Sequence, residues 1–147
     1  MYRNLRFTTW DQVEEEIQKL EKAQNVTSVG VWSYSQILEH LTLPLENALI
    51  EKKPMPWIVR AIFGKMFLNR LKKDGYMKIG NMNPEAPKKR EESDPAPYFI
   101  RFKKALNAYR EHKGEYTFNS FMGQLSREEN DMVNIYHIAH HLSFLNY

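Results

Sequence analysis

The sequence predicts an all-α domain, a four-helix bundle with a long crossover between the second and third core helices. Three observations favour it. Four segments repeat apolar residues at helical spacing, strand-like alternation is absent, and a stretch rich in glycine and proline separates the second segment from the third. The 147 residues suit a single domain over 1–147, and a hydrophobic fraction of 42% is enough to build a core.

Three of the expected helices begin at a residue that can cap them. Thr9, Ser33 and Ser126 are each followed three residues later by Gln or Glu, which is the pattern of a capping box. The fourth helix begins near Pro97, a residue tolerated in a first helical turn. The expected helices are therefore 9–23, 33–48, 97–112 and 126–145.

The middle of the chain has a different character. Residues 54–73 are apolar on nearly all sides if helical, so we expect them to be buried, to form a subunit contact or to cover a pocket. Residues 74–97 hold two glycines and four prolines and predict a long connection, and 115–124 is expected to be an aromatic-rich loop. Between 52 and 90 lie 11 Lys or Arg against two acidic residues, a basic insert that would attract an anionic partner.

Composition restricts the chemistry and the compartment. The absence of cysteine excludes disulfides and thiolate ligands, so a transition-metal site must use His, Asp or Glu. No apolar run reaches a membrane-spanning length, and the start has no signal-peptide pattern. We expect a cytoplasmic protein.

The basic residues of the insert do not gather on one helix face and no nucleic-acid motif occurs, so neither a membrane nor a nucleic acid is an expected partner.

Histidines supply the strongest candidate site. His137 and His141 are four residues apart and lie on one face of the last helix. Two ligands bind a metal weakly, and His40 of the second helix is the obvious third donor. Three protein ligands leave coordination positions open, as in catalytic metal sites. His140 is an alternative partner for His137.

Two other interpretations of the histidines stay open. His137 and His141 share their helix face with Asn130 and Asn134, and a polar stripe of this kind is usually solvated. A satisfied buried histidine is the other alternative. The rest of this helix is almost entirely apolar, however, which favours a stripe that faces the interior or a cleft.

Carboxylates do not form a convincing pair, so no catalytic residue can be assigned. Glu14, Glu15 and Glu16 are expected on a solvated face. Glu39 neighbours His40 in sequence and either orients a ligand or lies on the surface.

Two stretches resemble the signatures of a known superfamily. WSYSQILEHL at 32–41 and FMGQLSREENDMVNIYHIAHHLSFL at 121–145 are similar to those of the DinB-like (YfiT-like) superfamily, and RNLRFTTWDQVEEEIQKL resembles a branch of uncharacterised bacterial domains. The resemblance implies a four-helix bundle and a divalent metal ion (Zn, Ni, Fe or Mn) held by His40, His137 and His141. Many members follow the last ligand with Arg and then Gln, where this chain has Leu142 and Phe144.

The resemblance also suggests functions. We expect a metal-dependent transferase that uses a small thiol, or a hydrolase, with the basic insert suited to a small anionic or thiol ligand. One alternative is a metal- or ligand-binding stress protein without turnover. Another is a dimeric interaction module that pairs through 54–73 and whose histidines are incidental. A homodimer is expected by analogy.

Overall fold

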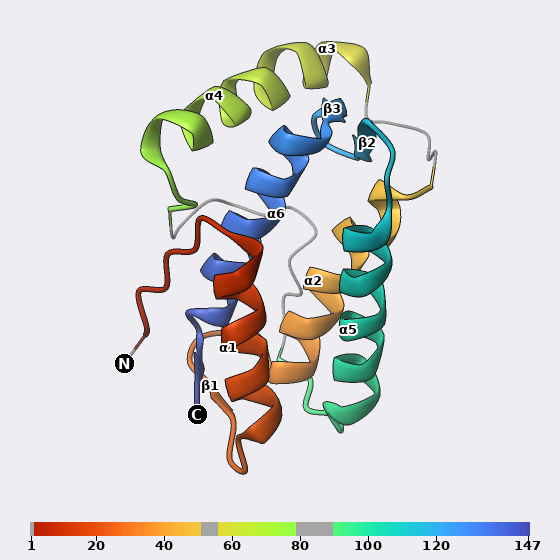
Figure 1. Cartoon of the computed structure of the whole chain (residues 1–147). Helices are drawn as coiled ribbons and strands as arrows, with labels where there is room; N and C mark the ends of the chain where they lie inside the picture. The colour runs from red at the N-terminus through yellow and green to blue at the C-terminus, as the bar shows by residue number, and fades with distance from the viewer. Residues whose placement is uncertain (1, 51–55, 79–89) are drawn as a thin grey trace.

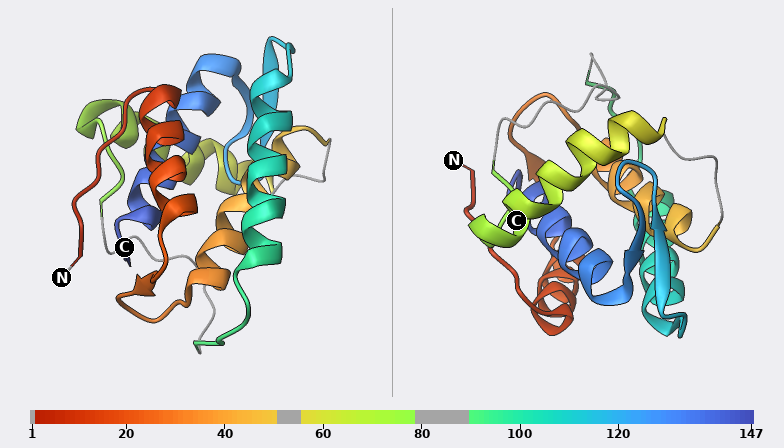
Figure 2. Two further views of the ribbon diagram at one scale, coloured as in Figure 1. Left: turned by 60° about the horizontal axis from the view of Figure 1, so that its bottom comes forward. Right: turned by 90° about the horizontal axis from the view of Figure 1, so that it is seen from above.

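The computed structural model describes residues 2–50, 56–78 and 90–147. In it, α1, α2, α5 and α6 lie side by side, and the run from α3 to α4 crosses one end of the molecule (Figures 1 and 2). The helices are α1 (Trp10–Lys22), α2 (Tyr34–Ala48), α3 (Trp57–Val59), the π-helix η1 (Arg60–Gly64), α4 (Lys65–Asp74), α5 (Ala96–Glu111) and α6 (Arg127–Leu142). The strands are β1 (Thr27–Ser28), β2 (Tyr116–Asn119), β3 (Gly123–Ser126) and β4 (Leu145–Asn146).

Capping fixes where three helices begin, as the sequence predicts. Thr9, Ser33 and Ser126 each accept a hydrogen bond from the amide three residues on, and the Gln or Glu side chain there reaches back to the cap. The fourth predicted helix corresponds to α5, which begins at Ala96 without a side-chain cap. These starts orient α2 and α6, the two helices that carry the candidate ligands.

The prediction of an all-α four-helix bundle is wrong. Two small antiparallel sheets accompany the helices, one formed by β1 and β4 and the other by the β2–β3 hairpin. The first sheet pairs Thr27 with Asn146 and Ser28 with Leu145, which ties the segment before α2 to the end of the chain. The fold therefore mixes helices with short strands.

The hairpin explains why this prediction failed. Its strands have four residues each, too few to show a clear alternation of apolar and polar residues. Its turn is stabilised by the Asn119 side chain, which accepts hydrogen bonds from the amides of Phe121 and Met122. Gly123 has a φ of 89°, which favours glycine. The expected loop at 115–124 is thus an ordered hairpin.

The hydrophobic core lies between α1, α2, α5 and α6. Its most deeply buried members include Val13, Leu38, Phe102, Ile138 and Leu142. A second cluster lies under α4 and is made of Leu68, Leu71, Leu125 and Val133. The hairpin is thereby packed between α4 and α6.

Glu16 departs from the expected solvated face, although Glu14 and Glu15 are exposed. Glu16 is only 3% exposed, and it pairs with Arg3 and Lys19. Tyr147 donates a hydrogen bond of 2.6 Å to the same carboxylate. These partners offset the cost of burying the charge, and because Arg3 and Tyr147 lie outside the helix, helical spacing alone could not identify the position.

The segment expected to be buried or to form a contact is helical and two-sided. Its described part runs from Trp57 to Asp74 through α3, η1 and α4. Gly64, Leu68 and Leu71 face inward, whereas several large apolar side chains face outward. Residues 54 and 55, and 79–89 of the expected long connection, lie outside the described residues, as do several lysines of the basic insert. Across the described ranges, no helix has both the length and the apolarity needed to cross a membrane.

We predict that Gly64→Ala destabilises the fold. A Cβ at this position would lie 2.9 Å from the carbonyl oxygen of Phe121, so η1 and the hairpin would have to move apart. The free energy of unfolding should fall by about 1–3 kcal/mol in urea denaturation followed by circular dichroism. Asn69→Ala, at an exposed position of α4, is the control and should change it by less than about 0.5 kcal/mol. Equal stability of the two variants would contradict this close contact.

Candidate metal centre

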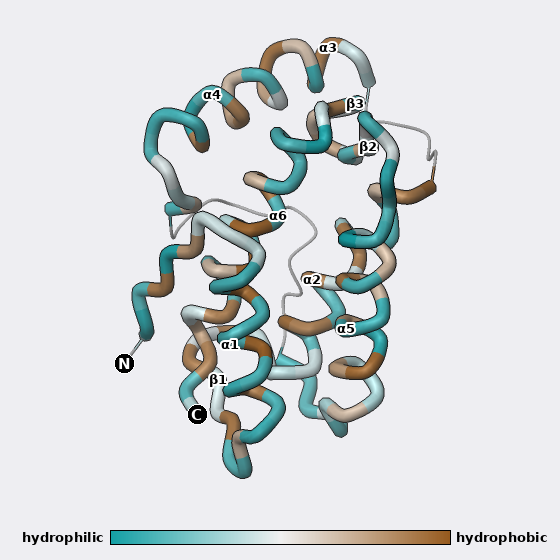
Figure 3. Tube along the Cα trace, viewed as in Figure 1, coloured by the Kyte–Doolittle hydropathy of each residue, from teal (hydrophilic) through white to brown (hydrophobic). Residues whose placement is uncertain are grey.

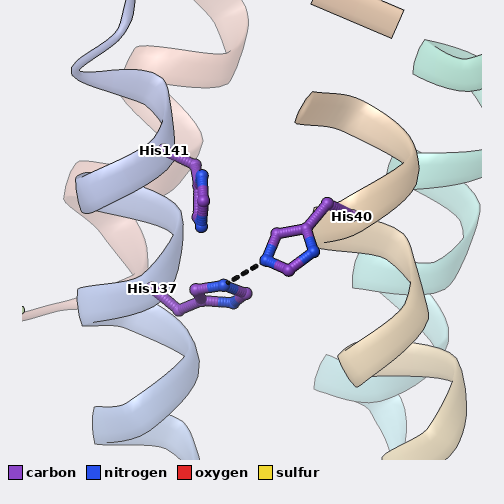
Figure 4. Close-up of side chains that lie close together, drawn as sticks. All are labelled: His40, His137 and His141. Atoms are coloured by element: carbon purple, nitrogen blue, oxygen red, sulfur yellow. Dashed lines mark hydrogen bonds between the residues drawn. The ribbon is translucent and has the colours of Figure 1, made fainter. Parts of the chain in front are cut away.

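Three partly buried histidines from two helices meet between α2 and α6. His40 extends from α2, and His137 and His141 extend from successive turns of α6, so that the three rings point toward one another (Figure 4). Each offers one ring nitrogen, and these nitrogens all lie within 4.8 Å of one another. Residues 97 positions apart in sequence thus form one cluster that could bind a metal ion.

The contact between His40 and His137 restricts the protonation of the cluster. Their Nε2 atoms are 2.9 Å apart, a hydrogen bond in which one nitrogen must donate and the other must accept. A ring that accepts through Nε2 is neutral. A neutral imidazole is the form that ligates a metal ion.

Burial keeps all three rings uncharged. Desolvation, together with the nearby His140, lowers the pKa of His40 to about 4. Desolvation also lowers the pKa of His137 and of His141 well below the usual value, and the neighbouring histidines act in the same direction. The free rings therefore present lone pairs at neutral pH.

Trp32 covers one side of the cluster. Its ring stacks on His141 with the centroids 5.3 Å apart and the planes at 9°. It also meets His40 edge to face at 4.6 Å. Trp32 directly precedes Ser33, the cap of α2, so the same short segment sets the start of the helix and holds two of the three rings.

His140, the alternative ligand, is outside the group of three. Its ring packs edge to face on His141 at 4.8 Å and hydrogen-bonds the backbone of Met77. Burial lowers the pKa of His140 as well. This residue connects α6 to the segment that follows α4, which is a structural role beside the cluster.

The donor set fits a divalent transition metal. Ligand nitrogens about 2.0–2.1 Å from a tetrahedral zinc ion lie roughly 3.3 Å from one another. The 2.9 Å contact and the 4.8 Å limit bracket this separation, so small ring rotations suffice. Three neutral nitrogens also suit nickel, iron or manganese, so the donors do not select among these metals.

Comparison with known proteins places the chain in a family. A family model described as a protein of unknown function, DUF1569, matches residues 1–147. The chain belongs to the DUF1569 family. Neither the curated proteins nor the solved structures gave a match to it.

The polar stripe of α6 lies in the interior of this DUF1569 chain. Asn130 is 1% exposed and Asn134 is 3% exposed, so the solvated-face interpretation is wrong for both. Asn130 donates to Thr117 of β2 at 2.7 Å, and Asn134 donates to Asn130 at 3.4 Å. These amides therefore form hydrogen bonds within the fold instead of with solvent.

A pocket of about 300 Å³ reaches His40 from the side of α2 and α5. Two carboxylates, Glu39 and Glu91, belong to its lining, and no Lys or Arg does among the residues that the structure describes. Its lining residues are Ser35, Gln36, Glu39, His40, Leu43, Glu91, Ser93 and Tyr98. Sequence reasoning missed Glu91, Ser93 and Tyr98, since only the fold brings them beside α2.

We predict that acid destabilises the metal-free DUF1569 protein. His40 has a folded pKa near 4 and an ordinary one near 6.5, so the unfolded chain binds the proton more readily between these values. Stability should fall as the pH drops through this window, by on the order of 2 kcal/mol at about pH 5 relative to about pH 7 from this group. Urea unfolding at both pH values, in the presence of a chelator, measures this difference in the free energy of unfolding.

His40→Gln provides the comparison for this effect. Removing the titrating ring should reduce the loss of stability between the two pH values. An identical loss in the wild type and in His40→Gln would contradict the assignment of acid sensitivity to the cluster.

Proposed function

We propose that this chain is a metal-dependent enzyme, a transferase that uses a small thiol or a hydrolase, in which His40, His137 and His141 hold one divalent ion. The observation that carries the proposal is the convergence of three neutral, partly buried ring nitrogens within 4.8 Å of one another. The proposed relationship to the DinB-like superfamily supports it, because the three positions match that superfamily's metal ligands.

The cluster suits chemistry that needs a strong local positive charge. Its three donors are uncharged, so they leave the charge of an ion uncompensated. A divalent ion held there would act as a Lewis acid on a ligand oxygen or sulfur. His137 and His141, one turn apart on α6, fix two of the donor directions, and His40 adds the third from α2.

The pocket beside His40 suggests what kind of ligand could reach the site. Ser35 and Ser93 contribute hydroxyl groups that bond to each other at 2.8 Å, and Tyr98 lines the same space. Glu39 and Glu91 give this lining a negative character, so it favours hydroxyl, thiol or amino groups over carboxylates. We propose Glu39, which lines the pocket together with His40, as the group that accepts a proton from the bound ligand.

A metal-binding protein without turnover is the second candidate. Trp32 favours it, because stacking on His141 and edge contact with His40 restrict access to the rings from that side. Observation of metal-dependent transfer of a thiol to a small electrophile, or of metal-dependent ester hydrolysis, would show that the chain is an enzyme. Tight metal binding with neither activity would support the second candidate.

We predict that the purified, tag-free protein binds about one divalent ion per chain, as a three-histidine site would. His137→Ala and His141→Ala should each lose the ion, because two remaining ligands hold a metal weakly. Elemental mass spectrometry after loading with zinc, nickel or manganese measures the content, and circular dichroism verifies the helical fold.

Two histidines provide matched controls for this measurement. His112 is exposed at the end of α5, and His140 lies beside the cluster without belonging to it. His112→Ala and His140→Ala should keep the ion. Loss of metal in His140→Ala with retention in His141→Ala would contradict the ligand assignment, and an unloaded wild type would contradict the proposal as a whole.

We also predict that Trp32→Leu weakens metal binding by about tenfold, a cost of about 1.4 kcal/mol. The substitution removes the ring contacts that hold His40 and His141 in place, but it leaves all three donors. Competition with a metallochromic chelator measures the affinity. Trp57→Leu, at a residue 70% exposed on α3, is the control, and equal affinity of the two variants would contradict the role of Trp32.

A further inference from the structure

The outer side of the helical run from α3 to α4 exposes an unusual number of large apolar side chains. This run lies across one end of the molecule, with one side turned away from the other helices (Figures 1 and 2). The exposed side chains, which we call the apolar patch, are Trp57 (70% exposed), Ile58 (54%), Ile62 (56%), Phe63 (51%) and Met66 (60%). Large apolar side chains exposed along one helical run are a feature of interaction surfaces.

Basic residues adjoin the patch on the same run. Lys65, Arg70, Lys72 and Lys73 are exposed, and the sequence from Trp57 to Lys73 contains no acidic residue. Lys72 pairs with Glu129 and Arg70 with Asp74, whereas Lys65 and Lys73 form no ion pair with any described residue. The surface therefore combines apolar side chains with uncompensated positive charge.

Apolar residues are more frequent at one end of the run and basic residues at the other, with Lys65 lying among the apolar residues. Hydrophobic positions predominate toward α3 and hydrophilic ones toward the end of α4 (Figure 3). The distribution of charge around a helix does not by itself show which of its sides faces outward, and this is why the sequence did not predict membrane contact. The inward positions are taken by Gly64, Leu68 and Leu71, which leaves the patch facing outward.

We propose that this surface docks the protein onto a membrane leaflet rich in anionic phospholipid, without crossing it. The patch would enter the boundary between headgroups and acyl chains, where Trp57 is favoured. Lys65 and Lys73 would meet lipid phosphates, each adding to the attraction. This surface is separate from the histidine cluster, and the proposal does not rest on metal binding.

Charge distinguishes this partner from a second copy of the chain. A two-fold symmetric dimer through the patch would place the same surface of both copies in one interface. Lys65 lies between Phe63 and Met66, so each copy would bring a lysine into this interface, and no acidic residue between Trp57 and Lys73 offsets the charge. An anionic lipid surface supplies the opposite charge and also conforms to a protruding helix.

Vesicle co-sedimentation of the full chain tests the proposal. The protein should sediment with vesicles of phosphatidylcholine that contain phosphatidylglycerol, and at least about tenfold less with phosphatidylcholine alone. Added salt should weaken the binding, because it screens the lysines. No binding to the anionic vesicles would overturn the proposal.

Matched variants localise the binding. Ile62→Asp should reduce it at least about tenfold, since it places a charge in the patch, whereas Ile100→Asp, at a residue 69% exposed near the start of α5, should leave it unchanged. Lys65→Glu combined with Lys73→Glu should also weaken binding about tenfold or more, and Lys104→Glu on α5 should not. All five positions are exposed, so the fold is expected to persist, with circular dichroism as the check.

Light scattering on the same variants tests whether a second copy of the chain binds the patch instead. We expect Ile62→Asp to leave the oligomeric state of the wild type unchanged. A wild-type dimer that Ile62→Asp converts into a monomer would assign the patch to a second copy and overturn the lipid proposal. Equal loss of vesicle binding in Ile62→Asp and Ile100→Asp would overturn it as well.

Discussion

The burial of α6 is the constraint on which the rest of the structure depends. This helix carries a polar stripe through the interior, and a buried polar group without a partner is costly. Three of its four members therefore find a hydrogen-bond partner: Asn130 bonds to Thr117 of β2, Asn134 to Asn130, and His137 to His40 of α2. The hairpin and α2 are held in place partly because they supply hydrogen-bond partners for the buried polar side chains of α6.

The same constraint shapes the chemistry of the site. Partial desolvation lowers the pKa values of the three histidines, so their rings are neutral, and they are close enough to one another to offer three lone pairs at one point. Trp32 covers this point from one side, while the pocket lined by Glu39 approaches it from another. A buried cluster with one polar approach is the arrangement expected of a site that admits a small ligand and little water.

Short sequence patterns predicted the helices, whereas contacts between residues far apart in sequence determine the fold class. The capping boxes at Thr9, Ser33 and Ser126 could be recognised because each is complete within four residues. The two small sheets could not, since β1 pairs with β4 from the other end of the chain and the hairpin strands are too short to show a period. At the site, His137 and His141 followed from helical spacing. The pocket residues Glu91 and Tyr98 reach His40 only through tertiary packing, and Glu16 is buried because Arg3 and Tyr147 converge on it.

X-ray absorption spectroscopy at the zinc edge of the zinc-loaded protein tests the central claim most directly, because it counts the histidine rings around the ion. We predict the multiple-scattering signature of three imidazoles, with nitrogen at about 2.0–2.1 Å and an additional light-atom ligand. His141→Ala should reduce the count to two or lose the ion. A spectrum of the wild-type protein dominated by oxygen, with one imidazole or none, would show that the cluster of His40, His137 and His141 is a buried structural feature and not a metal centre.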